Sequence, residues 1–191
     1  QYRVLIQTCT GSGCGSATSN TQNIVVANDP TISITGDAPN VCVGGSINMD
    51  ATVGGGVGCD VVWQFRVGTS GTWSEVASNV NSYTTSTALT AGTYQYRALY
   101  TTCDAGLGCD DAVSNTITLT VVNDPVVTIT SNLTQLCTNS TFTLSSTVSG
   151  GIPPTNYQWQ VSQGTWTSIP GAGFPTYTPT SVVAGTYQYR L

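Results

Sequence analysis

Apolar and polar residues alternate along most of this chain with a period of two, the pattern of half-buried β-strands. The clearest cases are SINMDATV at 46–53 and DVVWQFRV at 60–67. Their predicted inward residues are Ile47, Met49, Ala51, Val53, Val61, Trp63, Phe65 and Val67. Shorter runs follow at 72–76, 81–87, 92–102 and 114–122, separated by Gly- and Ser-rich turns. About seven short strands and no helical pattern predict a two-sheet β-sandwich.

This pattern repeats along the chain. The phrase AGTYQYR stands at 91–97 and again at 184–190, and the chain opens on its last three letters. NYQWQV, with Trp159, repeats the strand that holds Trp63. The unit length is about 94 residues, which is the size of one small β-sandwich domain.

The motif Asn-Asp-Pro marks the boundaries between units. It occurs at 28–30 and at 123–125, each time between two apolar strands. Because these residues favour turns and interrupt strand pairing, we interpret them as linkers. We therefore predict three parts: 1–29 as strands F and G of a preceding domain, 30–123 as a complete domain, and 124–191 as a domain lacking its last strand or strands.

Two explanations fit a chain that is cut within its own repeat. Residues 1–27 could complete the open sheet of another copy by strand donation, which would cover exposed sheet edges. However, Gln-Tyr-Arg at 1–3 duplicates 188–190, and a donated hairpin has no use for that duplicate. We therefore favour a segment of one longer polypeptide.

The order of landmarks resembles the immunoglobulin fold, in which a Trp lies on the third strand and a Gly-x-Tyr-x-Cys phrase forms a tyrosine corner on strand F. Here Tyr94 takes the corner position and Tyr187 is its copy. Tyr96 replaces the strand-F cysteine and Met49 replaces its partner, so the usual inter-sheet disulfide is absent. The resemblance implies tandem immunoglobulin-like domains, with Trp63, Tyr94, Tyr96, Trp159 and Tyr187 as core or corner residues.

The whole chain also resembles a narrower group. VCVGGSINMDATV, GTWSEV and SYTTSTALTAGTYQYRALYTTCDAGLGC are similar to the Ig-like repeats of very large Bacteroidota surface proteins, such as gliding-motility adhesins and secreted filaments. This resemblance implies export and display on the cell surface.

Composition excludes several functions. Charged residues make up 7% of the chain and the net charge is −5, against ~25% charged residues in typical domains. There is no Lys and no His, so neither a phosphate-binding basic patch nor a His-based catalytic set can form. We therefore expect no nucleic-acid binding and no enzymatic activity. No apolar run reaches the ~18 residues of a membrane span.

The seven cysteines are interpreted as disulfide formers, because their spacing lacks the patterns of zinc sites and no His is present. This interpretation indicates an extracellular compartment. In the immunoglobulin arrangement, the start of strand C faces the end of strand F, which favours Cys59–Cys103 together with Cys42–Cys109. The alternative is a local Cys103–Cys109 bridge with Cys42–Cys59. Cys9 and Cys14 either pair with each other or stay unpaired.

Five acidic residues gather in loops at one end of the complete domain: Asp29, Asp60, Asp104, Asp110 and Asp111. Carboxylate oxygens are ligands of Ca²⁺, so one hypothesis is a calcium site that stiffens the domain junction. The favoured alternative is that they cap turns and keep a weakly charged surface soluble. Apart from this calcium, no cofactor is expected.

Two functions of different kinds remain. The first is a structural spacer, in which tandem domains form a rod or fibre with neighbouring repeats, or with further copies, as partners. The second is adhesion, in which loops or the exposed Trp73 and Trp166 bind a surface polysaccharide or partner protein. Because the faces carry no conspicuous patch, the sequence favours the spacer.

Overall fold

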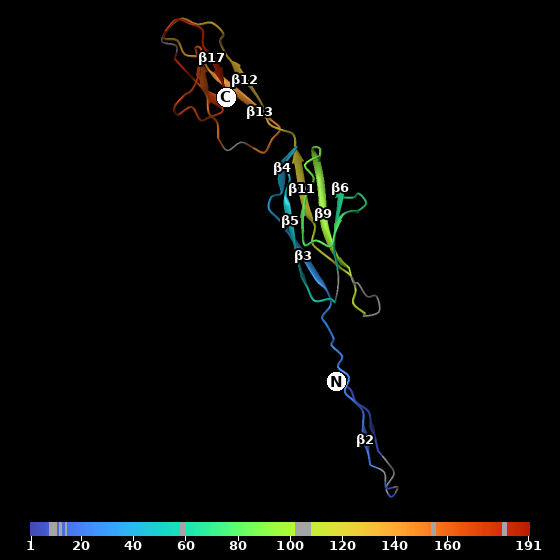
Figure 1. Ribbon diagram of the computed structural model, residues 1–191. Helices are drawn as coiled ribbons and strands as arrows, with labels where there is room; N and C mark the ends of the chain where they lie inside the picture. The colour runs from blue at the N-terminus through green and yellow to red at the C-terminus, as the bar shows by residue number, and fades with distance from the viewer. Residues whose placement is uncertain are drawn as a thin grey trace.

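The computed structural model describes residues 1–7, 11, 13, 15–57, 60–101, 108–153, 156–180 and 183–191. Figure 1 shows a hairpin near the N-terminus, a sandwich in the middle of the chain and a second sandwich near the C-terminus. No helix in the described part of the chain is long and apolar enough to cross a membrane.

The N-terminal hairpin pairs β1 (Leu5–Ile6) with β2 (Ala17–Thr18), and Leu5 lies opposite Thr18. A separate bridge joins Tyr2 to Gln22. Most of the apolar side chains of this region are exposed. The described part of the hairpin is therefore a two-stranded ribbon without a core of its own.

The middle sandwich consists of two sheets. The first contains, in spatial order, β3 (Thr31–Gly36), β5 (Asn48–Gly54) and β8 (Ser82–Thr84). The second contains β4 (Asn40–Cys42), β11 (Ile117–Val122), β9 (Gly92–Thr101), β6 (Asp60–Val67) and β7 (Ser74–Ser78). The short β10 (Ala112–Val113) also pairs with β9. All pairs are antiparallel except β4 with β11, which is parallel.

This strand order is immunoglobulin-like: strands A, B and E face strands A′, G, F, C and C′. The predicted all-β fold of tandem immunoglobulin-like sandwiches is confirmed. The core between the sheets is formed by fully buried Trp63, Tyr96, Ile47, Met49 and Leu119. The Trp63 Nε1–H donates to the carbonyl oxygen of Val80 at 2.9 Å, so the one polar atom of this indole is satisfied.

The last apolar residues of the alternating pattern in β5 and β6 are not buried. Val53 lies near the end of β5 and Val67 ends β6, and both are exposed, Val67 to 63%. The prediction that they face inward was wrong, because period two fixes the side of a strand but not how far the facing sheet extends over it.

The C-terminal sandwich repeats part of this plan. One sheet holds β12 (Val126–Ser131), β13 (Leu144–Ser149) and β16 (Thr176–Tyr177). The other holds β15 (Trp166–Ser168), β14 (Gln160–Ser162) and β17 (Gln188–Arg190). Its core contains Phe142, Leu144, Trp159 and Ala172. The Trp159 Nε1–H donates to the Phe174 carbonyl oxygen at 2.9 Å, as Trp63 does to Val80.

Candidate functional sites: the linker clasps and an open groove

Each Asn-Asp-Pro linker is bound by the glycine turn that follows strand B of the next sandwich. The carbonyl oxygen of Asn28 accepts a hydrogen bond from the Gly56 N–H at 2.9 Å. At the second linker, the carbonyl oxygen of Asn123 accepts one from the Gly151 N–H at 2.6 Å. We call this arrangement the linker clasp, and it is the same at both linkers.

The clasp requires glycine. Gly55 and Gly150 have φ of +64° and +69°, a region that side chains disfavour. A Cβ on Gly150 would also lie 2.6 Å from the carbonyl oxygen of Asp124, and one on Gly55 would collide with that of Asp29. The linker backbone thus packs directly on the turn.

Strand F of each sandwich carries a tyrosine corner. The Tyr94 hydroxyl donates to the Thr90 carbonyl oxygen at 3.0 Å, and the Tyr187 hydroxyl donates to the Val183 carbonyl oxygen at 3.3 Å. The buried Tyr96 ring lies 6.1 Å from that of Tyr83. Burial, followed by the neighbouring Tyr83 and Tyr94, raises the pKa of Tyr96 to about 12.

The outer face of the C and F strands carries a layer of planar side chains that sequence reasoning missed. The guanidinium carbons of Arg66 and Arg97 lie 4.5 and 4.3 Å from the ring centre of Trp73. Arg190 repeats the contact on Trp166 at 4.3 Å. These cation–π contacts place charge on the tryptophan rings. The recurrence of Trp73 and Arg97 as Trp166 and Arg190 was the available signal.

Glutamine amides fix the same arginines. The Nε of Arg97 donates to Gln64 Oε1 at 2.9 Å, and the Nε of Arg190 donates to Gln160 Oε1 at 2.7 Å. Burial and the neighbouring Arg66 lower the pKa of Arg97. The arginines of this layer thus pack on tryptophan rings and hydrogen-bond to glutamine amides of the sheet surface.

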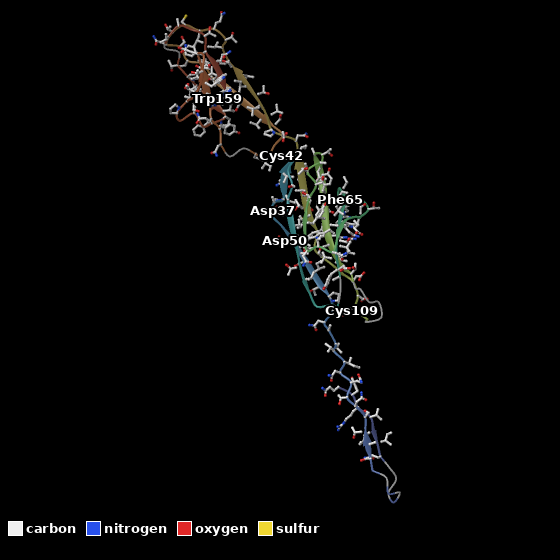
Figure 2. All side chains as sticks on the ribbon, viewed as in Figure 1. Asp37, Cys42, Asp50, Phe65, Cys109 and Trp159 are labelled. Carbon is white, nitrogen blue, oxygen red and sulfur yellow. The ribbon has the colours of Figure 1, made fainter. Side chains whose placement is uncertain are left out.

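The predicted Cys42–Cys109 disulfide is not formed, and this part of the pairing was wrong. Cys42 ends β4, opposite Val122 at the end of β11, whereas Cys109 precedes β10 near the other end of β9 (Figure 2). The reason is that β4 runs parallel to β11, so Cys42 lies at the end of strand G rather than at its beginning. Both thiols are free, so the alternative bridges Cys42–Cys59 and Cys103–Cys109 are not formed either.

The other cysteine predictions are not addressed by the structure. Cys9, Cys14, Cys59 and Cys103 lie outside the described residues. The Cys59–Cys103 bridge therefore stays a prediction, as does the local pairing of Cys9 with Cys14.

The acidic residues form no metal site within the part of the chain that the structure describes, where no three Asp, Glu, Cys or His side chains come together. Asp104 lies outside that part. With its amide turned to satisfy its neighbours, Asn79 Nδ2 donates to both carboxylate oxygens of Asp60 at 2.8 and 2.9 Å. This contact is the turn-capping role expected of a loop aspartate, and the calcium hypothesis stays untested.

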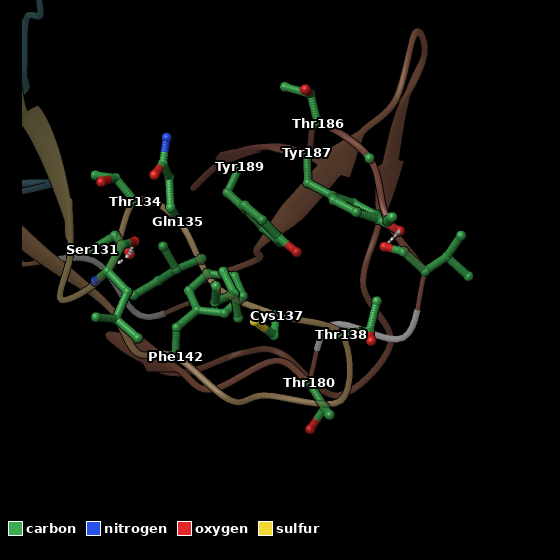
Figure 3. A pocket seen from close by; sticks show the side chains of 16 residues that line it. Ser131, Thr134, Gln135, Cys137, Thr138, Phe142, Thr180, Thr186, Tyr187 and Tyr189 are labelled. Atoms are coloured by element: carbon green, nitrogen blue, oxygen red, sulfur yellow. Dashed lines mark hydrogen bonds between the residues drawn. The ribbon is translucent and has the colours of Figure 1, made fainter.

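An open cavity of about 950 Å³ lies in the C-terminal sandwich. Figure 3 shows Tyr187 and Tyr189 on one side of it and Phe142, Cys137 and Thr180 on the other. It also extends along Thr134–Cys137, the counterpart of β4. β17 is the edge strand of its sheet, and its open side corresponds to the side of β9 that pairs with β11 in the middle sandwich. We therefore call the cavity the strand groove. Sequence analysis did not predict this cavity.

Comparisons with known proteins give the following matches. Residues 126–191 match the model of a family described as a domain of unknown function (DUF8696). A comparison with curated proteins finds no match. Among solved structures, the three N-terminal domains of the Hoc outer capsid protein of bacteriophage RB49 are 17% identical at a TM-score of 0.42, with 84% of this chain and 53% of that chain covered.

Two further structures are similar. A 1.5-MDa bacterial ice-binding adhesin is 20% identical at a TM-score of 0.44, covering 83% of this chain and 54% of that one. Fibronectin(III)-like modules of Clostridium thermocellum CbhA are 18% identical at 0.36, covering 78% and 79%. This chain thus spans about half the length of the Hoc and adhesin structures. Because these TM-scores are below 0.5, the fold assignment rests on the strand order.

Proposed function

We propose that this chain is a structural repeat segment of an extracellular or cell-surface fibre, in which the sandwiches act as rod-like spacers. The observation that carries the proposal is the linker clasp. Two linkers 95 residues apart bind the following sandwich through the same backbone hydrogen bond and the same glycine turn. Because the clasp recurs in each repeat, its role concerns how successive repeats are connected rather than the folding of one domain.

The clasp supports stiffness for physical reasons. Three linker residues leave little freedom, and Pro30 and Pro125 fix φ at the start of strand A. The hydrogen bond from Gly56 or Gly151 then holds the linker carbonyl against the sandwich. Short restrained linkers transmit orientation from one unit to the next, as in other tandem-repeat proteins.

The composition supports an extracellular location and a non-enzymatic role. A surface of Thr, Ser, Asn and Gln with few charges suits a passive spacer, and the Cys59–Cys103 and Cys9–Cys14 bridges that stay predicted would suit an oxidising compartment. The chain also has no His and no Lys, two of the common groups in acid–base catalysis. We therefore propose a non-enzymatic protein without a resident cofactor, whose partners are neighbouring repeats.

The test compares Gly150→Ala with Gly171→Ala. Both glycines have positive φ, +69° and +77°, but only the Cβ at 150 would strike the linker, whereas none of the described atoms lies near the Cβ at 171. Small-angle scattering on dilute protein should show a broader range of end-to-end distances for Gly150→Ala and an unchanged profile for Gly171→Ala. Equal profiles for the two variants would contradict a stiffening role of the clasp.

Adhesion is the second candidate, and one observation favours it. Trp166 is 38% exposed and occupies the same place on its sandwich as Trp73, so each unit offers an aromatic ring on one face. Exposed rings can stack on sugars, but Arg190 already covers part of the Trp166 ring. A glycan array with the full chain distinguishes the two functions. Binding that Trp166→Ala abolishes would favour adhesion over the spacer.

A further inference from the structure

The outer face of the larger sheet in the middle sandwich carries both arginines of that sandwich. Tyr96 is buried, so its neighbour Arg97 points outward from β9. Arg66 comes from the adjacent β6, and the two guanidinium carbons lie 4.5 and 4.3 Å from the Trp73 ring centre. We call Arg66, Arg97 and Trp73 the arginine patch. Arg66 lies opposite Gln95, so Arg97 is its diagonal neighbour, and such neighbours are about 7–8 Å apart.

Two acidic residues of the same sheet bear on the charge of this patch. Glu75 of β7 lies opposite Gln64, so two arginines against one glutamate leave a surplus of positive charge. Asp60 lies at the other end of β6, about 20 Å along the strand from Arg66. Burial and then the charge of Arg66 lower the pKa of Arg97. An approaching carboxylate would therefore relieve a repulsion between the two arginines.

The outer face of the smaller sheet carries a matching pair of carboxylates. Met49 is buried and Asp50 is exposed, so Asp50 points away from the core. Asp37 lies opposite Asn48: its N–H donates to the Asn48 carbonyl oxygen at 3.1 Å, and its Oδ1 accepts from the Asn48 N–H at 3.2 Å. Asp37 and Asp50 are therefore also diagonal neighbours, with the same spacing of about 7–8 Å. We call Asp37, Asn48 and Asp50 the aspartate patch.

Hydrogen bonds orient the aspartate patch without exhausting its acceptors. Ser82 Oγ donates to Asp50 Oδ1 at 2.6 Å, and Asn48 Nδ2 donates to Asp37 Oδ2 at 3.4 Å. Each carboxylate oxygen has two acceptor sites, so both aspartates can still accept from a guanidinium group. β3, β5 and β8 contain no Arg, and the chain has no Lys. The strands of this face therefore supply no positive charge.

The two patches lie on opposite sides of one layer of the core. The ring centres of Tyr83 and Tyr96 are 6.1 Å apart. Tyr83 lies opposite Met49, the neighbour of Asp50, and Tyr96 is the neighbour of Arg97. Figure 1 shows β6 and β9 to the right of β5, and Figure 2 shows the two aspartates of the patch on the left of this sandwich. Two copies that join one patch to the other therefore lie side by side.

The C-terminal sandwich repeats the arginine contact but not the carboxylates. Arg190 stacks on Trp166. On the opposite sheet, Asn132 accepts from the Thr143 N–H at 2.7 Å, as the first aspartate of the patch does from its partner. Ser145, which follows buried Leu144, takes the position of the second aspartate. The match of opposite charges is thus a property of the middle sandwich.

We propose that the arginine patch of one copy of this chain binds the aspartate patch of a second copy, so that copies associate side by side. Guanidinium and carboxylate groups form paired hydrogen bonds, and the two pairs of charges share one spacing. Tryptophan and arginine are also the residues enriched at the centre of protein interfaces. The net charge of −5 opposes association only weakly, because distant charges are screened beyond ~8 Å in physiological salt.

This association goes beyond the spacer function, which concerns the connection of repeats along one chain. The two patches occupy opposite outer faces of the same sandwich. A copy bound through one patch therefore keeps its other patch exposed for a third copy. Fibres of such chains would gather into lateral bundles.

The test combines charge reversal with analytical ultracentrifugation of the full chain. The wild-type chain should associate in a concentration-dependent series. Arg66→Glu with Arg97→Glu makes both patches acidic, and Asp37→Arg with Asp50→Arg makes both basic. Each double variant alone should associate about 10-fold or more weakly, because like charges then face each other. An equimolar mixture of the two should restore association, and restoration also shows that both variants are folded.

A matched control separates the patch from the net charge. Asp50→Arg and Asp110→Arg change the charge of the chain equally, and both aspartates are exposed. Asp110 precedes β10 and belongs to neither patch. Asp50→Arg should weaken association, whereas Asp110→Arg should leave it unchanged.

Three results would overturn the proposal. One is a wild-type chain that stays monomeric at its highest soluble concentration. Another is association that neither double variant weakens, which would assign the contact to a different surface. The third is a monomer that binds polygalacturonate and loses this binding in Arg66→Glu with Arg97→Glu, which would assign the arginine patch to an acidic polysaccharide. None of these substitutions alters the linker clasps, so scattering from dilute protein still tests the spacer function separately.

Discussion

The two sandwiches share a sequence phrase but differ in how deeply they bury it. In the middle sandwich, Tyr94 and Tyr96 are 6% and 1% exposed, and β9 runs through all of AGTYQYR except its first residue. In the C-terminal sandwich, Tyr187 and Tyr189 are half-buried and β17 covers only Gln188–Arg190. The difference is that β11 pairs with strand F (β9) in the middle sandwich, with β4 on the other side of β11.

This comparison separates local from long-range effects. Both tyrosine corners form, because the hydroxyl reaches a carbonyl four residues earlier on the same chain. Burial of the rings depends instead on a strand contributed by residues 117–122, which are distant in sequence. A strand without a neighbour on one side keeps its local geometry, but its tyrosine rings are less buried.

The largest effect on stability is expected for a substitution in strand G of the middle sandwich. Leu119→Ala should lower the free energy of unfolding of the middle sandwich by about 2–5 kcal/mol, because Leu119 is fully buried. Ile24→Ala, at the corresponding exposed position, should change it by less than ~0.5 kcal/mol. Urea denaturation of dilute protein measures both. Similar losses for the two would show that the hairpin strand is already buried.

The bridge between the sheets should give the next largest effect. Asn115→Ala leaves the Ile34 N–H and C=O without their partner, which should cost about 1–3 kcal/mol. Asn20→Ala should leave the stability of the monomer unchanged. Hydrogen exchange at the Ile34 amide should accelerate in Asn115→Ala and stay protected in Asn20→Ala.

High pH should unfold the middle sandwich in a predictable window. Because the folded-state pKa of Tyr96 is raised from 10.0 to about 12, its stabilisation is complete below pH 10 and is lost as the pH rises towards 12. Burial also raises the pKa of Tyr189, so the C-terminal sandwich should respond in the same direction. Tyrosinate absorbance during denaturation at increasing pH measures this.

A control identifies the group responsible. Tyr96→Phe should flatten the stability of the middle sandwich between pH 10 and 12, since no ionisable group then remains at that position. If stability still falls as steeply, another tyrosine is responsible for the loss.

The smallest effect is expected when the hydroxyl group of either tyrosine corner is removed. Tyr94→Phe should cost about 1 kcal/mol, because it removes a hydrogen bond from a buried ring at 3.0 Å. Tyr187→Phe should cost about half of that or less, because its bond is longer and more exposed. Thermal unfolding of each variant gives the two values. Equal losses of stability would mean that packing of β11 against Tyr94 does not strengthen the hydrogen bond of the tyrosine corner.

Sequence alone determined the features that depend on neighbouring residues. Period-two alternation identified the strands around Met49 and Trp63, and the repeated Asn-Asp-Pro placed the linkers. These signals are local, because strand faces and turns follow from the backbone conformation of a few consecutive residues.

Features that depend on which strands lie side by side became visible in the structure alone. The parallel pairing of β4 with β11 placed Cys42 away from Cys109, and the reach of the facing sheet exposed Val67. The groove beside β17 and the stacking of Arg97 on Trp73 are likewise contacts between distant segments. A period of two says which side of a strand is apolar, but pairing and cover are set by residues elsewhere in the chain.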